Sequence, residues 1–216
     1  MTEGTAKFFL LQVNDALFPI GGYSHSYGLE TYIQKGLVHD EDSAEEFIHK
    51  RLEYNFLYNE FLAVRLGWEY AVSGDLEAIS RLEEIMEAGK IPRETREASR
   101  KLGSRFIKTL SALEIPRENR VFEEYREARK GKSVHHAVAY GVFCGAAGIT
   151  REEALEHFLY AQTSAMVTNC VKTIPLSQSS GQKLLSGCYP LLQKMTEKVT
   201  ELGEEWLGLS GPGFDL

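Results

Sequence analysis

The chain has 216 residues, of which 43% are hydrophobic and 25% charged, so it can bury a core without disulfides. Its formal net charge is −7, and no basic stripe of useful length is found, which argues against nucleic acid as a partner. The three cysteines, Cys144, Cys170 and Cys188, include no CxxC pair, as is typical of a reducing compartment. No stretch resembles a signal peptide or reaches membrane-spanning length. We therefore expect a soluble, cytoplasmic protein that does not contact a membrane.

The first half of the chain predicts helices separated by turn residues. A short helix is expected over 8–17, ended by Pro19 and the Gly21-Gly22 pair, and a second over 26–36. Asp40 or Asp42 can cap a long helix that runs to about residue 72. A helix from residue 75 to about residue 87 follows, with Asp75 as its cap.

The second half continues the helical pattern. Helices are expected over 92–113 and 117–130, with Ser133 as the cap of the next one. The segment 137–147 is apolar on all sides, which indicates a buried helix, and Gly141 and Gly145 would let a neighbouring helix approach closely. A capping-box pattern opens a helix over 150–172. The last helix, over 178–202, should kink or split at Gly187 and Pro190.

No strand pattern of useful length is found, so the sequence predicts an all-α protein. We expect one domain over residues 1–216, a bundle of roughly eight to ten helices. The segments 1–7 and 208–216 are expected to be flexible ends.

The sequence contains no catalytic motif of known spacing. GxxxxGK[ST], GxSxG and HExxH are all absent, so this chain should not hydrolyse nucleotides through a phosphate-binding loop. One alternative is a small helical hydrolase that uses His25, Ser26 and Asp15. The competing interpretation is that Ser26 caps a helix and His25 packs locally.

Other polar residues allow two interpretations. His135, His136 and His157, with Cys144 and Cys170, lack the spacing of metal ligands, so a structural role is favoured over a metal site. Tyr140, Asn169, Lys172, Gln178 and Gln182 flank or follow the apolar helices. Such groups are either hydrogen-bonded structure or anchors of a protein interface, and spacing alone does not decide between them.

Four blocks of sequence, in order along the chain, resemble urease accessory protein F, the UreF family. The sharpest block is 11–30, LQVNDALFPIGGYSHSYGLE, and the second is 102–110, LGSRFIKTL. The third covers 136–143, HAVAYGVF. The fourth runs from YAQTS at 160–164 through NCVK at 169–172 to PLSQ at 175–178 and Gly181-Gln182.

The resemblance implies an all-α homodimer that is not an enzyme. It implies a complex with the accessory protein UreD, also called UreH, and with the GTPase UreG. That complex docks on apo-urease and delivers nickel in a GTP-dependent manner, so nickel and GTP are handled by the complex and this chain binds no cofactor of its own. Family members usually continue beyond this point with a segment ending in a His-Glu and Ser-Arg-Leu type motif. In the family this segment contributes to the contacts with UreD/UreH, so the sequence as given does not predict those contacts for this chain.

The resemblance also implies residues that contact partners or shape the motif. Pro19, Gly21 and Gly22 would shape the turn that presents residues 23–26, which include Tyr23, His25 and Ser26. The block from His25 to Glu30 would lock the first helices together or face a partner. Lys172 matches a basic position of the family and is expected either to contact UreG or to be structural. The remaining motif residues are listed together as partner-binding or structural candidates: Arg105, Tyr140, Gln178 and Gln182.

Overall fold

A computed structural model describes residues 3–21, 28–90, 93–113, 115 and 117–210 of the chain. The all-α prediction is confirmed, because 76% of the protein is helical and the described residues contain no strand. The α-helices are α1 (Glu3–Asn14), α2 (Leu29–Gln34), α3 (Glu41–Arg51), α4 (Leu62–Ser73), α5 (Leu76–Gly89), α6 (Arg93–Ala112), α7 (Val121–Ala128), α8 (His136–Ala146), α9 (Arg151–Thr173), α10 (Gln178–Gly187) and α11 (Tyr189–Val199). A π-helix, η2 (Leu52–Phe61), lies between α3 and α4, and a 3-10 turn, η3 (Glu204–Trp206), follows α11.

The predicted long helix of the first half is present as one continuous rod formed by α3, η2 and α4. Asp40 is its cap, because the Asp40 carboxylate accepts from Ser43 N at 2.9 Å and Ser43 Oγ accepts from Asp40 N at 3.1 Å. Gly74, in the left-handed region at φ 74°, ends the rod. The π-helical widening in its middle was not predicted, since the apolar periodicity alone does not distinguish it from an α-helix.

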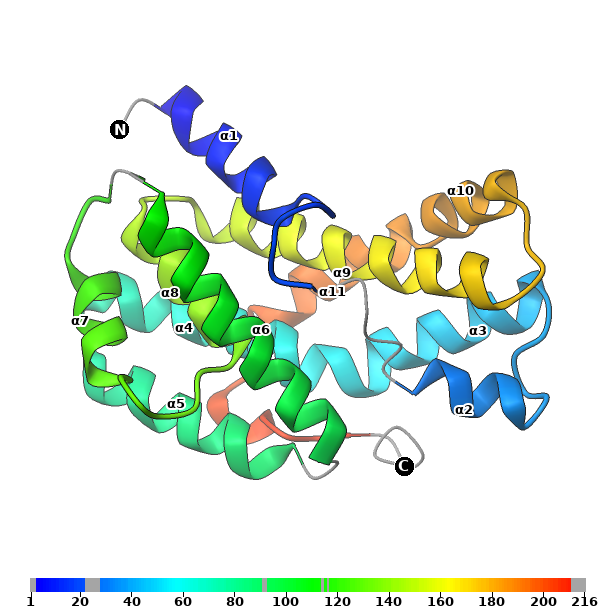
Figure 1. The fold of residues 1–216 in the computed structure, drawn as a ribbon, viewed down its shortest axis with the longest axis horizontal. Coiled ribbons are helices and arrows are strands. Elements are labelled where there is room, and N and C mark those ends of the chain that lie inside the picture. Colours follow the sequence, from blue (N-terminus) through cyan, green and yellow to red (C-terminus); the bar gives the residue numbers. More distant parts are fainter. Residues whose placement is uncertain (1–2, 22–27, 91–92, 114, 116, 211–216) are drawn as a thin grey trace.

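The centre of the fold is the crossing of α4 with the fully buried helix α8. An added Cβ at Gly141 would lie 2.3 Å from the Val64 carbonyl oxygen, and one at Gly145 would lie 2.8 Å from the Trp68 carbonyl oxygen. The predicted role of Gly141 and Gly145 in a close helix approach is therefore confirmed. The rod and α9 both run along the long axis of the molecule, and α6 crosses in front of α8 and the α4 end of the rod in Figure 1.

The second half follows the predicted boundaries closely. Thr150 caps α9 by accepting from Glu153 N at 3.3 Å, and Ser177 caps α10 by accepting from Ser180 N at 3.0 Å. The predicted last helix is split, since α10 ends at Gly187 and α11 begins at Tyr189 with Pro190 in its first turn. The predicted cap at Ser133 is wrong: α8 starts after His135, and the Ser133 carbonyl instead accepts from Arg129.

Both ends of the described chain adopt defined local structure, and their predicted flexibility stays a prediction. Helix α1 already begins at Glu3 and ends at Asn14, three residues before the predicted end at Leu17. At the other end, the π-helix holds the segment after η3. Gly208 N donates to Tyr58 O at 3.1 Å, and Asn59 Nδ2 donates to Leu209 O at 3.0 Å. Asn55 Nδ2 also donates to Ser210 Oγ at 2.7 Å, so bonds from η2 hold the chain as far as Ser210.

Candidate functional site

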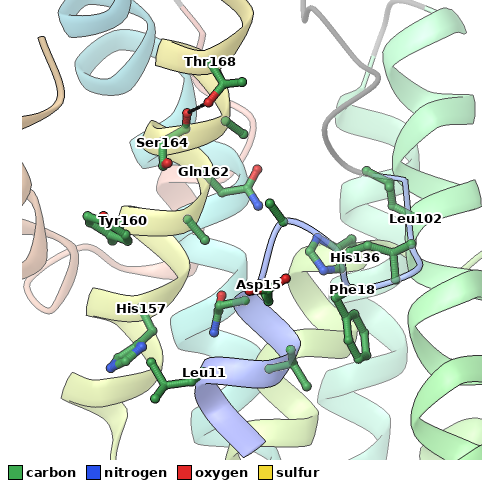
Figure 2. A pocket seen from close by; sticks show the side chains of 16 residues that line it. Leu11, Asp15, Phe18, Leu102, His136, His157, Tyr160, Gln162, Ser164 and Thr168 are labelled. Carbon is green, nitrogen blue, oxygen red and sulfur yellow. Dashed lines mark hydrogen bonds between the residues drawn. The ribbon is translucent and has the colours of Figure 1, made fainter. Parts of the chain in front are cut away.

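A groove of about 400 Å³ lies between the end of α1, the turn after it and the middle of α9. Figure 2 shows its lining, with His136, Phe18 and Leu102 at one end and His157 and Tyr160 at the other. All four blocks of sequence singled out above contribute to this groove. Most residues of the first block between Leu11 and Ile20 line the groove. The other blocks contribute Leu102, His136, Tyr160, Ala161, Gln162 and Ser164. The fold therefore brings segments that are far apart in the sequence to one place.

Tyr140 holds the end of α1 in place through a hydrogen bond to Asn14. Asn14 Nδ2 donates to Tyr140 Oη at 2.8 Å, and Tyr140 Oη donates to Ala154 O at 3.3 Å. The Tyr140 ring is fully buried, and its centroid lies 4.8 Å from that of Phe158. Burial raises the pKa of Tyr140 well above its ordinary value, so the hydroxyl stays protonated and able to donate. Tyr140 is thus a buried residue with hydrogen bonds to α1 and α9.

The turn at residues 18–21 is held against α6. Phe18 packs edge-on against Phe106 with centroids 5.9 Å apart, and Arg105 Nη1 donates to Ile20 O at 3.2 Å. Pro19 is exposed between these two buried residues, and Gly21 has φ 82°, a conformation that favours glycine. The described part of this segment, up to Gly21, lies against α6, and Arg105 connects the first and second blocks directly.

His136 is the polar group at the closed end of the groove. Its side chain is 8% exposed, and its Nε2 has no hydrogen-bond partner among the residues that the structure describes. Aromatic rings of Phe106, Tyr140 and Phe158 surround it. Burial lowers the pKa of His136 to about 4, so the imidazole is neutral at physiological pH. Sequence reasoning did not select His136 for this place, because nothing in the spacing shows that it faces α1 and α9.

Comparison with known families decides what these blocks mean. A model of the UreF family matches residues 38–189, most of the chain. The chain belongs to the UreF family. UreF proteins are urease accessory proteins, a generally non-catalytic family whose members associate with other urease accessory proteins. The resemblance drawn from the sequence is thereby confirmed.

The UreF match contains three of the four blocks. It includes 102–110, 136–143 and 160–182, whereas the block at 11–30 lies before the matched range. The structure nevertheless joins the first block to the matched region, because Asn14 bonds Tyr140 and Ile20 bonds Arg105. The N-terminal segment is therefore integrated with the UreF-like helices.

A second group of motif residues lies at the corner between α9 and α10. Lys172 is exposed in the last turn of α9, and Gln178 and Gln182 are exposed on α10. Gly181 lets the two helices meet closely, because a Cβ there would lie 2.6 Å from a methyl group of Val171. Lys172 is four positions beyond Thr168, the last residue of α9 that lines the groove, which is about 6 Å along the helix at 1.5 Å per residue. The corner therefore begins about one helical turn beyond the end of the groove.

The other motif residues of the first block are not assigned to the groove or to the corner between α9 and α10. Glu30 is exposed in the first turn of α2. Tyr23, His25 and Ser26 lie outside the described residues. The hydrolase alternative therefore stays untested, since of its three residues only Asp15 is described. Asp15 lines the groove, and its Oδ1 accepts from Leu17 N at 2.7 Å.

One chain of serine, histidine and glutamate does occur, away from the groove. His135 Nδ1 lies 3.0 Å from Ser99 Oγ, and its Nε2 lies 3.1 Å from Glu87 Oε2. Burial, with the nearby charges of Lys90 and Arg100, lowers the pKa of His135 to about 3. An imidazole of that acidity is a poor general base at neutral pH. We interpret the chain as a buried hydrogen-bond network between α5, α6 and the start of α8.

The described part of the chain offers no group of three or more metal-ligating side chains. Cys144, Cys170 and Cys188 are buried, and burial raises the pKa of Cys188 to about 11, so the thiol is not reactive at neutral pH. The helices within the described ranges include none that is both long and apolar enough to span a membrane.

Removing the Tyr140 hydroxyl should loosen α1 without unfolding the protein. In Tyr140→Phe, the second N–H of Asn14 loses its acceptor while its bond to Leu10 O remains. We expect a loss of about 1 kcal/mol in the free energy of unfolding, with faster amide exchange in α1. Urea unfolding and hydrogen exchange measure both, with Tyr189→Phe, at a half-exposed tyrosine, as the control. Unchanged exchange in α1 would show that the Asn14–Tyr140 bond does not hold the helix.

Proposed function

We propose that this chain is a non-catalytic subunit of the urease maturation complex. In this role it acts in the cytoplasm as a homodimer, together with UreD/UreH and the GTPase UreG. The complex docks on apo-urease and supports GTP-dependent insertion of nickel. Nickel and GTP are handled by the partners, in keeping with a sequence that lacks a phosphate-binding loop.

The convergence of the four family blocks is the observation that carries this proposal. Nine of the sixteen residues that line the groove are apolar or aromatic, and the imidazole of His136 is neutral, although His157 and Asp15 also line it. A mainly apolar lining suits the insertion of a protein side chain. Exposed apolar side chains adjoin it, namely Phe8 and Leu11 on α1 and Tyr160 on α9. Exposed apolar and aromatic residues beside a hollow are typical of protein–protein contact surfaces.

The corner between α9 and α10 is the proposed contact with UreG. Its polar side chains, Lys172, Gln178 and Gln182, are exposed on the rigid ends of two helices that Gly181 holds together. A lysine in this position supplies a point charge that can pair with carboxylates of the GTPase. The proposed partner of the groove is a second copy of the chain or UreD/UreH.

Recruitment of UreG tests both the function and the role of Lys172. The purified chain is mixed with UreD/UreH and UreG, and the complex is isolated by size exclusion. We expect Lys172→Ala to reduce UreG recruitment about tenfold, while UreD/UreH still binds. Lys35→Ala, at an exposed lysine on the end of α2, is the matched control. Unchanged recruitment by Lys172→Ala would refute the contact, whereas failure of the wild-type chain to bind either protein would refute the proposed function.

A further inference from the structure

Helix α6 carries a line of cations on its solvent face. Its inward face is formed by buried residues, among them Leu102, Phe106 and Leu110. Lys101, Arg105 and Lys108 follow one another at spacings of four and three residues, so they share the opposite face, and all three are exposed. We refer to these three residues as the basic stripe.

The charges of the basic stripe are poorly compensated within the chain. In the first half of α6, Arg93 Nε lies 2.7 Å from Glu97 Oε1, and Arg100 Nε lies 2.7 Å from Glu87 Oε2. From Lys101 to the end of α6 the sequence contains no acidic residue. Lys101 helps to lower the pKa of Glu97, whose carboxylate is already paired with Arg93. Lys108 has no ion pair within the ranges that the structure describes.

The stability of α6 does not account for this arrangement. Cations favour a helix C-terminus through the macrodipole only within the last turn, and the last turn of α6 has no basic residue. Arg105 donates one N–H to Ile20 O, which leaves most of the donors of its guanidinium for other acceptors. The row of positive charge therefore does not serve to stabilise α6, and it stands out on the surface of a protein whose net charge is −7.

An apolar projection stands beside the basic stripe. Phe18 and Ile20 point into the protein, and the bond from Arg105 to Ile20 O places their turn against α6. Pro19, which lies between these two residues, is exposed. Leu17, which precedes them, is 87% exposed, the largest value among the large apolar side chains described. Cations next to a protruding leucine form a surface that is both charged and apolar.

We propose that the basic stripe, with Leu17 and Pro19, docks an acidic segment of a partner protein. Carboxylates of that segment pair with Lys101, Arg105 and Lys108, and an apolar side chain of it covers Leu17. Three cations in a protein of net charge −7 are too few to hold a nucleic acid. The inference extends the proposed function, because it assigns a third contact surface to the same complex.

The test reverses the charge of Lys101 and Lys108, whose side chains do not hold any other part of the fold in place. The Lys101→Glu/Lys108→Glu variant is compared with Lys35→Glu/Lys130→Glu, which has the same net charge and alters exposed lysines outside α6. Binding of each variant to purified UreG, UreD/UreH and apo-urease is measured at about 50 mM and about 300 mM NaCl. Zero-length carbodiimide cross-linking of the wild-type mixtures, followed by mass spectrometry, then locates the carboxylates joined to Lys101 or Lys108.

We expect the Lys101→Glu/Lys108→Glu variant to bind one of the three proteins at least about tenfold more weakly at low salt, while the control variant binds as the wild type does. Cross-links from Lys101 or Lys108 to carboxylates of that same protein are expected. Equal binding by both variants at low salt would overturn the inference while leaving the proposed function intact. Absence of binding by the wild-type chain to all three proteins would overturn both. Wild-type binding to a DNA duplex that the reversal abolishes, with protein binding unchanged, would also overturn it.

Discussion

Gly141→Ala should destabilise the fold by about 3 kcal/mol or more. The added Cβ would lie 2.3 Å from the Val64 carbonyl oxygen and 3.0 Å from Trp68 N, both backbone atoms of α4. Because backbone atoms of a buried helix cannot rotate away, α4 and α8 would have to separate along the centre of the fold. The groove depends on this crossing, since His136 and Tyr140 are carried by α8. The free energy of unfolding in urea is the appropriate measurement.

Gly187→Ala is the matched control for the crossing. There the nearest atom to an added Cβ is Glu45 Oε1 at 3.3 Å, the end of a flexible side chain. We expect a change within about 0.5 kcal/mol, because the carboxylate can move aside. If both alanine variants unfolded at the same urea concentration, the close approach of α4 and α8 would not be a determinant of stability.

Glu83→Gln should change how the stability of the protein depends on pH. Glu83 is fully buried; it accepts a hydrogen bond from Tyr125 Oη, and its Oε2 accepts from His135 N at 2.9 Å. Burial raises the pKa of Glu83 from its ordinary 4.5 to about 7, against the opposing influence of these bonds and of Arg129. The folded protein therefore holds this proton more tightly than the unfolded chain does. Between pH 4.5 and 7 the folded state binds more protons, so ionisation of Glu83 reduces stability as the pH rises.

The comparison of wild type with Glu83→Gln isolates this effect. His135 and His136 also titrate differently in the folded and unfolded states, but both variants contain them. Relative to Glu83→Gln, the wild type should lose up to about 3 kcal/mol of unfolding free energy between pH 4.5 and pH 8. Chemical denaturation at those two pH values measures the difference. A difference that stays constant, or that favours the wild type as the pH rises, would contradict a raised pKa of Glu83.

Most helix boundaries could be predicted because local signals define them. Asp40, Asp75 and Thr150 act as caps through bonds to residues three positions further on, so neighbouring letters contain the information. The break between α10 and α11 follows in the same way from Gly187 and Pro190. Gly141 and Gly145 predicted a close helix approach, although only the structure shows that the partner is α4.

Features that depend on distant residues could not be predicted from the same signals. The π-helix η2 is associated with the segment around Leu209, some 150 positions away, which bonds to Asn59. Ser133 has the right residue type for a cap, but Arg129 occupies its carbonyl and α8 begins later. The first outcome depends on a contact between distant residues, whereas Arg129 lies only four positions from Ser133 and no capping motif signals their bond.

The candidate site was predicted as a set of residues but not as an arrangement. The family resemblance selected Arg105 and Tyr140, and the structure shows that they bond Ile20 O and Asn14, which unites the blocks. It did not show that the corner with Lys172 lies just beyond the end of the groove along α9. A structural role was favoured over a metal site for His136, but nothing in the sequence placed its ring in the groove among aromatic side chains.

Urease activation in cells tests the central claim most directly. A host that carries a urease gene cluster, with its own UreF gene deleted, receives either this chain or its own UreF as a positive control. The account predicts that this chain restores urease activity and the nickel content of the purified urease. If the chain is expressed and folded, yet restores neither while the host protein restores both, the account of this chain as a subunit of the urease maturation complex is contradicted.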